Sequence, residues 1–172
     1  MSKFDLRAVG ITAGVTRHRV AASATRTYVG EPLGVAASYT AGAVAAADNT
    51  VIQIADGGPL IATDEFRGIC SQDFEVNSAG TVIAHYTEAI SFIPYATKVR
   101  GKAKATANSD TQSELTGQLG DLVVFDLTSS AYRIDADNTG VAAGGLQIVD
   151  GNTTRGTLDC FVDARAMRTI VA

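Results

Sequence analysis

From residue 30 onward the chain alternates between short apolar runs and short polar stretches rich in Asp, Asn, Gly and Ser. The apolar runs are rich in Val, Ile, Thr and Phe, residues that fit the pleated surface of a β-sheet. They cover residues 33–37, 50–54, 66–71, 81–93, 121–127, 131–134, 146–149 and 157–162. No sustained helical pattern recurs between them, so alternating strands and helices are not expected. The pattern predicts an all-β fold, an antiparallel barrel or sandwich of short strands.

Two of the separating stretches carry a more specific signal. The Asp-Gly dipeptide at 150–151 predicts a tight turn, because both residue types adopt positive φ at low energetic cost. Ser109 is followed by Gln112 at the spacing of a capping box, which is typical of the start of a helix. Ser, Thr and Asp compete for backbone hydrogen bonds in this stretch. We therefore expect at most one short helix, ending near Gly117.

The first 30 residues differ from the rest of the chain. No helical or strand period persists among their mixed Ala, Thr, Gly and Arg residues, and five cations accompany one acid, Asp5. The cations are Lys3, Arg7, Arg17, Arg19 and Arg26. Two interpretations are open: an extended N-terminal arm that lies on a partner and is disordered when free, or an irregular terminus. We assign 1–30 to the arm and 31–172 to a β-barrel or sandwich domain, with a division into two lobes joined near 106–120 as an alternative.

Composition and charge narrow the function classes. The 172 residues are 46% apolar, but 28 of them are alanine and none is tryptophan. A domain of this size buries roughly 70% of its unfolded surface and needs no disulfide or metal to fold. A net charge of -4 and a pI near 5.0 argue against a general nucleic-acid binder, which is normally basic. The same composition excludes a collagen, a coiled coil and a disordered chain.

No segment predicts membrane insertion or export. The longest apolar stretches are broken by alanine, and none approaches the ~20 residues that cross a bilayer. The first residues lack the apolar core that a secretory signal requires. The chain is therefore expected to be soluble and made in the cytosol.

The residue types that usually perform catalysis or bind metals are few and scattered. Cys70 and Cys160 each lie in an apolar run and are expected to be small buried hydrophobic residues, with a single bridge as the alternative. His18 and His85 do not form a zinc cluster with them, and no serine or cysteine motif marks a nucleophile. Residues 135–140 resemble the start of a calcium loop, but the position of its final Glu ligand is apolar, so a polar turn is predicted. We expect no enzyme, no cofactor and no metal.

The sharpest pattern is the basic strip, which we define as Lys98, Arg100, Lys102 and Lys104. These four cations occupy alternate positions, so an extended segment would place all four on one face. Two readings are open: a docking strip for an acidic surface or for phosphates, or an edge strand whose lysines block further strand pairing. Between residues 110 and 163, nine acidic residues accompany only two basic ones. This polarity favours head-to-tail contacts between copies or with a larger assembly.

Four segments carry a likeness to known proteins. They are Gly-Glu-Pro-Leu-Gly-Val-Ala at 30–36, Gly-Asp-Leu-Val-Val at 120–124, Leu-Gln-Ile-Val-Asp-Gly-Asn at 146–152, and Gly-Thr-Leu-Asp-Cys-Phe-Val-Asp at 156–163. With them the chain resembles the head decoration, or cement, proteins of tailed bacteriophages. Those proteins are small, acidic, tryptophan-poor β proteins rich in Ala, Gly, Thr and Val, with an N-terminal arm. The segments are not diagnostic motifs, and no catalytic or binding residue is transferred from them.

The resemblance implies a structural virion protein on the capsid exterior, made in the host cytoplasm, whose partner is the major capsid protein. It implies several copies clustered at a symmetry point, so a homo-oligomer with a trimer favoured is expected, and neither a membrane nor a nucleic-acid partner. Bridging neighbouring capsid subunits would resist internal DNA pressure. The candidate contact residues are the basic strip and the cations Arg7, Arg17, Arg19 and Arg26. The alternative is a phage tail, fibre or adhesin module for a host surface ligand, which the lack of Trp disfavours.

Overall fold

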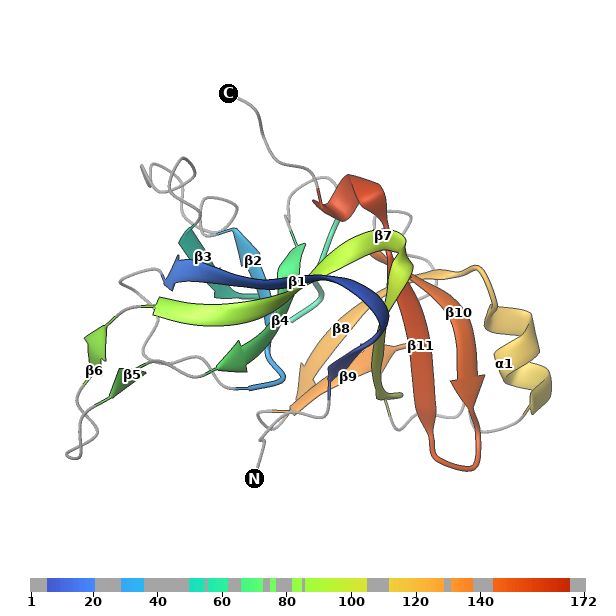
Figure 1. The fold of residues 1–172 in the computed structure, drawn as a ribbon. Coiled ribbons are helices and arrows are strands. Elements are labelled where there is room, and N and C mark those ends of the chain that lie inside the picture. Colours follow the sequence, from blue (N-terminus) through green and yellow to red (C-terminus); the bar gives the residue numbers. More distant parts are fainter. Residues whose placement is uncertain are drawn as a thin grey trace.

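The structure is a computed structural model that describes residues 6–20, 29–35, 50–54, 56–61, 66–72, 75–76, 82–84, 86–104, 112–128, 131–137 and 144–167. Within these ranges the chain forms eleven strands, one α-helix and one 3-10 turn (Figure 1). The strands are β1 (Arg7–Val20), β2 (Pro32–Val35), β3 (Thr50–Gln53), β4 (Phe66–Gln72), β5 (Glu75–Val76), β6 (Val82–Ala84), β7 (Tyr86–Lys102), β8 (Leu122–Thr128), β9 (Ala131–Asp135), β10 (Leu146–Asn152) and β11 (Thr157–Val162). The helix is α1 (Gln112–Gln118), and the 3-10 turn is η3 (Ala164–Met167).

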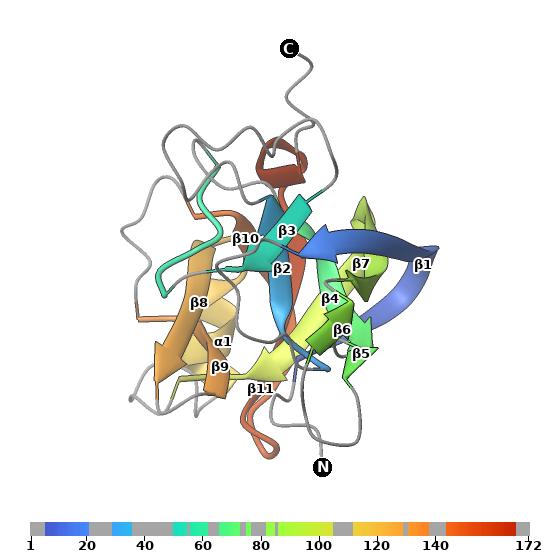
Figure 2. The ribbon, with the colours of Figure 1, turned by 90° about the vertical axis from the view of Figure 1, so that its left-hand side faces the viewer.

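Nine of the strands form one sheet that curls on itself (Figures 1 and 2). Its order is β1-β3-β2-β4-β7-β11-β10-β8-β9, and β5 and β6 form a separate two-stranded sheet. The end of β1 pairs in parallel with the start of β3, and β1 pairs antiparallel with β7 along most of its length. The circuit β1-β3-β2-β4-β7 therefore closes on itself, and β11, β10, β8 and β9 continue the sheet from the second half of β7. The predicted all-β fold with at most one short helix is confirmed.

The eight predicted apolar runs each contain all or most of an observed strand, because they supply the buried positions of the sheet. Two strands are longer than the predicted apolar runs: β1 has 14 residues and β7 has 17. β7 continues past the end of the predicted run at 81–93 because Thr97, Val99 and Gly101 are buried while the residues between them face outward. This single long strand connects the two halves of the sheet.

The core lies inside the curl and is built mainly from Val, Ile, Leu and a few aromatic residues. The rings of Phe66 and Phe92 pack edge to face with centroids 5.1 Å apart, and those of Phe125 and Tyr132 pack likewise at 5.9 Å. The hydroxyl of the fully buried Tyr132 donates a hydrogen bond to the carbonyl of Ile54. Buried Tyr needs such a partner, because an unpaired hydroxyl in the core is destabilising.

The first 30 residues are only partly an arm. Residues 7–20 are extended, as predicted, but they form β1, which lies opposite β7 from Arg7 at Arg100 to Arg19 at Tyr86. The expectation that this stretch is free and disordered is therefore wrong. Register shifts occur beside Gly10 and Gly14, whose φ angles are 96° and 98°. These bulges break the period of two, which is why the sequence pattern did not indicate a strand.

Local structure corrects one turn and confirms the helix. The turn predicted at 150–151 is wrong: β10 runs through both residues, and the chain reverses at 153–156, where Gly156 has a φ of 59°. α1 lies in the predicted place, and its Leu115 is buried in the core, whereas Ser109 lies outside the described residues. Figures 1 and 2 both place α1 away from β1.

Candidate functional site

The paired strands β1 and β7 carry the most exposed large apolar side chains of the described residues. We call this pair, residues 7–19 and 86–100, the β1–β7 ribbon. Ile11 is 72% exposed, Val15 is 60% exposed and Tyr95 is 55% exposed. Apart from the contact of residues 19–20 with β3, the described residues place no strand on the second edge of β1. Large apolar side chains exposed on one pair of strands make this pair the candidate surface for contact with another molecule.

A bulge in β7 presents Tyr95 to solvent. Between the pairs Gly10–Thr97 and Thr12–Phe92 the two strands shift register, so residues 93–96 bulge beside Ile11. The backbone of Tyr95 has a φ of 58°, a left-handed conformation that costs an L-residue about 1–2 kcal/mol. Its ring packs edge to face on Phe161 with the centroids 6.2 Å apart. Such backbone strain is found preferentially at contact and active sites.

The basic strip occupies one face of β7, as its alternation predicts. Lys98 and Arg100 are half-buried and Lys102 is exposed, whereas the intervening Val99 and Gly101 are buried. In this region β7 pairs with β1 on one edge and with β11 on the other. The strip is therefore central in the sheet, and the reading of an edge strand that blocks pairing is wrong.

Arg100 is held by a carboxylate of the neighbouring strand. Its Nε and Nη2 donate to the two carboxylate oxygens of Asp159 at 2.5 Å each, a bidentate arrangement. The Asp159 side chain is 4% exposed and that of Arg100 is 33% exposed. The hydrogen bonds and the charge of Asp159 raise the pKa of Arg100. Arg100 thus compensates a buried negative charge, which limits what it can offer to a partner.

Lys104 lies just beyond β7 and bridges two buried carboxylates. Its Nζ lies 3.1 Å from an Asp126 oxygen and 3.0 Å from an Asp135 oxygen. The carboxylate side chains are 10% and 9% exposed, and the Lys104 side chain is 34% exposed. Without this ammonium, two desolvated negative charges would share one site. Lys104 therefore stabilises the packing of β8 and β9 against the end of β7.

The contacts of Lys104 lower the pKa of Asp126 and raise the pKa of Lys104 itself. These shifts define the pH range in which the cluster stabilises the fold. Burial disfavours the charged form of Asp126, but hydrogen bonds from Thr128 and Lys104 and the charges of Lys104 and Arg133 outweigh it and lower its pKa. Hydrogen bonds to Asp135 and Asp126 raise the pKa of Lys104. The Asp126 contribution to stability is present above about pH 4 and is lost as pH falls through its folded-state pKa. The Lys104 contribution is present below about pH 10 and is lost as pH rises through its folded-state pKa.

The remaining candidate cations differ in how much they face solvent. Lys98 lies over the ring of Phe161, with its Nζ 5.8 Å from the centroid, and Lys102 donates to the carbonyl of Arg155 at 2.5 Å. Arg7 and Arg17 are exposed on β1. The backbone of Arg19 lies in β1, and Arg26 lies outside the described residues. Lys98, Lys102, Arg7 and Arg17 are therefore the candidates that a partner could reach.

The acidic half of the sequence contributes less surface charge than its composition suggests. Asp126, Asp135, Asp159 and Asp163 are all buried. The first three pair with the basic strip, and Asp163 pairs with Arg165 at 2.8 Å. The expected polarity between a basic strip and an acidic half is therefore partly neutralised inside the fold.

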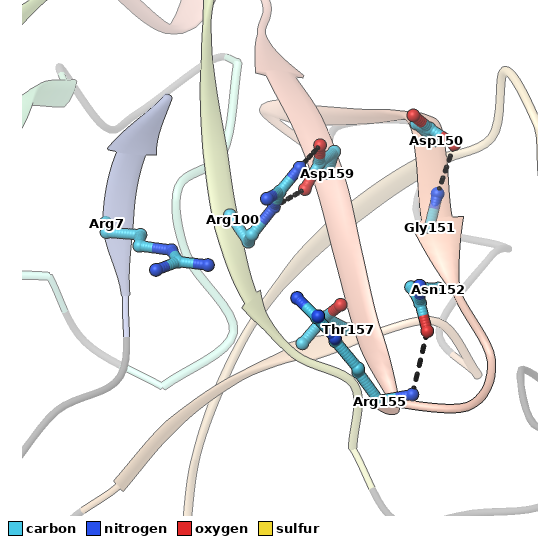
Figure 3. A pocket seen from close by; sticks show the side chains of 8 residues that line it. All are labelled: Arg7, Arg100, Asp150, Gly151, Asn152, Arg155, Thr157 and Asp159. Carbon is cyan, nitrogen blue, oxygen red and sulfur yellow. Dashed lines mark hydrogen bonds and ion pairs between the residues drawn. The ribbon is translucent and has the colours of Figure 1, made fainter. Parts of the chain in front are cut away.

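A small hollow lies between β1, β7, β10 and β11 (Figure 3). Its volume is about 160 Å³, and polar or charged side chains dominate its lining. It is lined by Arg7, Arg100, Asp150, Gly151, Asn152, Arg155, Thr157 and Asp159. Sequence reasoning did not identify Arg155, Asp150 or Asp159, since no local motif connects residues on strands that lie this far apart in sequence.

The cysteine predictions are confirmed. Cys70 and Cys160 are both buried, and neither forms a disulfide. The Cys70 Sγ lies 3.2 Å from the Thr87 hydroxyl oxygen, and burial raises the pKa of the Cys160 thiol. Burial therefore keeps the Cys160 thiol protonated, which makes it a packing group and not an activated nucleophile.

The described residues contain neither a metal-binding cluster nor a helix that could span a membrane. No group of three or more His, Cys, Asp or Glu side chains in this part of the chain could hold a metal ion. Asp135, at the start of the calcium-like stretch, instead accepts from Lys104 and from the backbone N–H of Asp137. Among the described helices none has the length and apolar character to span a membrane. His18 is buried near the end of β1, and His85 lies outside the described residues.

Comparisons of the chain with protein-family models, with curated proteins and with solved structures found no match.

Proposed function

We propose that this chain is a structural virion protein that decorates a phage capsid on its exterior and stabilises it by bridging neighbouring major capsid protein subunits. The proposal combines the resemblance of four sequence segments to phage decoration proteins with the character of the β1–β7 ribbon. The observation that carries it is the exposure of Ile11, Val15 and Tyr95 on two long paired strands. A protein that stabilises a capsid by binding to its subunits needs an exposed apolar surface of this kind.

Rigidity of the ribbon supports a role in bridging. β1 is paired along β7, and β7 is paired on its other edge first with β4 and then with β11. The Thr97 hydroxyl also donates to the carbonyl of Ile11 beneath the bulge. Because the strands are ordered before binding, little backbone entropy, about 1–2 kcal/mol per residue otherwise, is lost when a partner is engaged.

Charge on the ribbon favours an acidic partner surface. Arg7 and Arg17 on β1 and Lys98 on β7 lie on the same ribbon as the apolar side chains. Interfaces commonly combine an apolar centre with a charged rim, and rim charges increase the association rate more than the affinity. We expect acidic residues on the capsid surface to face these cations, so attachment should weaken as salt concentration rises.

Co-sedimentation with capsid shells tests the proposal. The purified chain is mixed with expanded shells assembled from the major capsid protein of the same phage, and separately with unassembled capsid protein. The expected result is that the chain pellets with shells in a saturable ratio and does not bind the unassembled subunit, because a bridging site exists only between subunits. A chain that stays in the supernatant with shells even at low salt would remove this function.

A further inference from the structure

Four charged residues form a row across the sheet at the hollow of Figure 3. Strand register places Arg7 opposite Arg100, and Arg100 opposite Asp159 on its other side. Asp159 in turn lies opposite Asp150 of β10. Like charges directly opposite each other in a sheet are destabilising. Asp159 compensates Arg100 through its bidentate contact, so among the described residues the charge of Arg7 has no close counterpart.

A third guanidinium comes from the turn that follows β10. Arg155 lies in the turn at 153–156, and Figure 3 shows its side chain and that of Arg7 directed toward the hollow from two sides. Neither of these two side chains has a hydrogen bond or ion pair within the described residues. Arg100 uses Nε and Nη2 for Asp159, which leaves its Nη1 group available at the same hollow.

We propose that this hollow, lined by Arg7, Arg100 and Arg155, binds a small oxyanion, a carboxylate or a phosphate group. Three arginines and two aspartates line it, so it keeps a net positive charge after Asp159 has neutralised Arg100. Guanidinium groups present planar pairs of N–H donors that match the oxygens of carboxylates and phosphates. An oxyanion here relieves the repulsion between the opposed arginines.

Size restricts the ligand to a small group. The hollow of about 160 Å³ is roughly ten times the ~15 Å³ that one water molecule needs, but about half the ~300 Å³ at which drug-sized sites begin. A carboxylate side chain from a bound protein and a free phosphate both fit this description. Both sources present negatively charged oxygen atoms to the guanidinium groups, and a comparison of acetate with phosphate distinguishes them.

Nuclear magnetic resonance of the isolated, 15N-labelled chain tests the site. Sodium phosphate or sodium acetate is titrated at constant ionic strength, with sodium chloride as the balancing salt. Saturable shifts are expected at the Gly151, Asn152 and Thr157 amides and at the arginine Nε–H groups of the hollow. Equal affinity for acetate and phosphate would indicate a carboxylate source, and a preference for phosphate would indicate a phosphate source. Linear shifts no larger than those with chloride would overturn the site.

Variants identify the arginines involved. Arg7→Gln/Arg155→Gln is expected to weaken phosphate binding by about tenfold or more, because two charge-assisted hydrogen bonds are lost. Arg155→Gln alone, at an exposed turn, is expected to weaken it by several-fold and serves if the double variant does not fold. The matched control is Arg17→Gln, an exposed arginine of β1 outside the hollow. Equal binding by the control and either hollow variant would overturn the assignment. No shell is present, so failure here leaves the proposed function untouched.

Discussion

The double variant Ile11→Glu/Val15→Glu is expected to bind capsid shells about 30-fold more weakly than the natural chain, because loss of two central apolar contacts typically costs about 2 kcal/mol in total. The two side chains are 72% and 60% exposed in the isolated protein, so their replacement removes little packing within the fold. The added carboxylates also repel an acidic partner surface. Quantitative co-sedimentation over a range of shell concentrations measures the change.

Leu119→Glu is the matched control for this variant. Leu119 is also a large apolar residue and is 48% exposed. It directly follows α1, which lies away from β1 in both Figures 1 and 2. The affinity of Leu119→Glu for shells should stay within about twofold of that of the natural chain. The melting temperatures of both variants should be close to that of the natural chain, since exposed substitutions usually change stability by less than about 0.5 kcal/mol. Equal weakening by both variants would mean that the ribbon is not the contact surface.

Lys104→Met is expected to lower the free energy of unfolding by about 2 kcal/mol, because Asp126 and Asp135 would lose the cation between them. The loss is smaller than the 3–5 kcal/mol typical of a fully buried pair, since the Lys104 side chain is 34% exposed and partly screened by solvent. Methionine keeps most of the apolar stem, so the change reports charge more than packing. Urea denaturation at neutral pH measures it.

Lys102→Met is the control within the same strip. Lys102 is exposed and makes one hydrogen bond to the Arg155 carbonyl, so its loss should cost less than about 1 kcal/mol. The deficit of Lys104→Met should shrink below about pH 4, because protonation of Asp126 removes a negative charge that Lys104 compensates. A Lys104→Met variant as stable as Lys102→Met would contradict the structural role assigned to Lys104.

Most strands were predictable because each contains a run of apolar residues that is bounded by turn residues and supplies buried positions of the core. The apolar runs at 121–127 and 157–162 lie within one residue of β8 and β11, since a shifted strand would turn its apolar side chains outward. β1 was not predictable in this way. Its glycine bulges disturb the alternation of inward-facing and outward-facing residues. A segment with exposed apolar residues such as Ile11 and Val15 has a sequence as typical of a disordered chain as of an edge strand.

The role of the basic strip was only half predictable. Alternation shows that four cations share a face, but it cannot show what lies opposite them. Arg100 meets a carboxylate 59 residues away in sequence, and Lys104 meets one 31 residues away. These partners depend on the register of β7 against β11 and on the packing of β9, which no local pattern encodes. The strip therefore divides into two cations that stabilise the fold and two that face outward.

The oxyanion hollow was not predictable for the same reason. Its arginines come from β1, β7 and the turn after β10, and each is unremarkable in its own segment. Only the strand register brings Arg7 beside Arg100 and places the turn next to both. A site assembled from residues of four strands and of the turn between two of them has no sequence signature.

Amide hydrogen exchange of the shell-bound chain tests the central claim most directly, namely that this is a rigid contact protein whose β1–β7 ribbon faces its partner. The measurement compares exchange in the free chain with exchange on expanded shells. We predict slower exchange on shells in Arg7–Val20, whose second edge is largely free of strand pairing in the described structure, and no change in Gln112–Gln118 of α1. Protection confined to α1 and β10, with β1 exchanging as fast as in the free chain, would contradict the account.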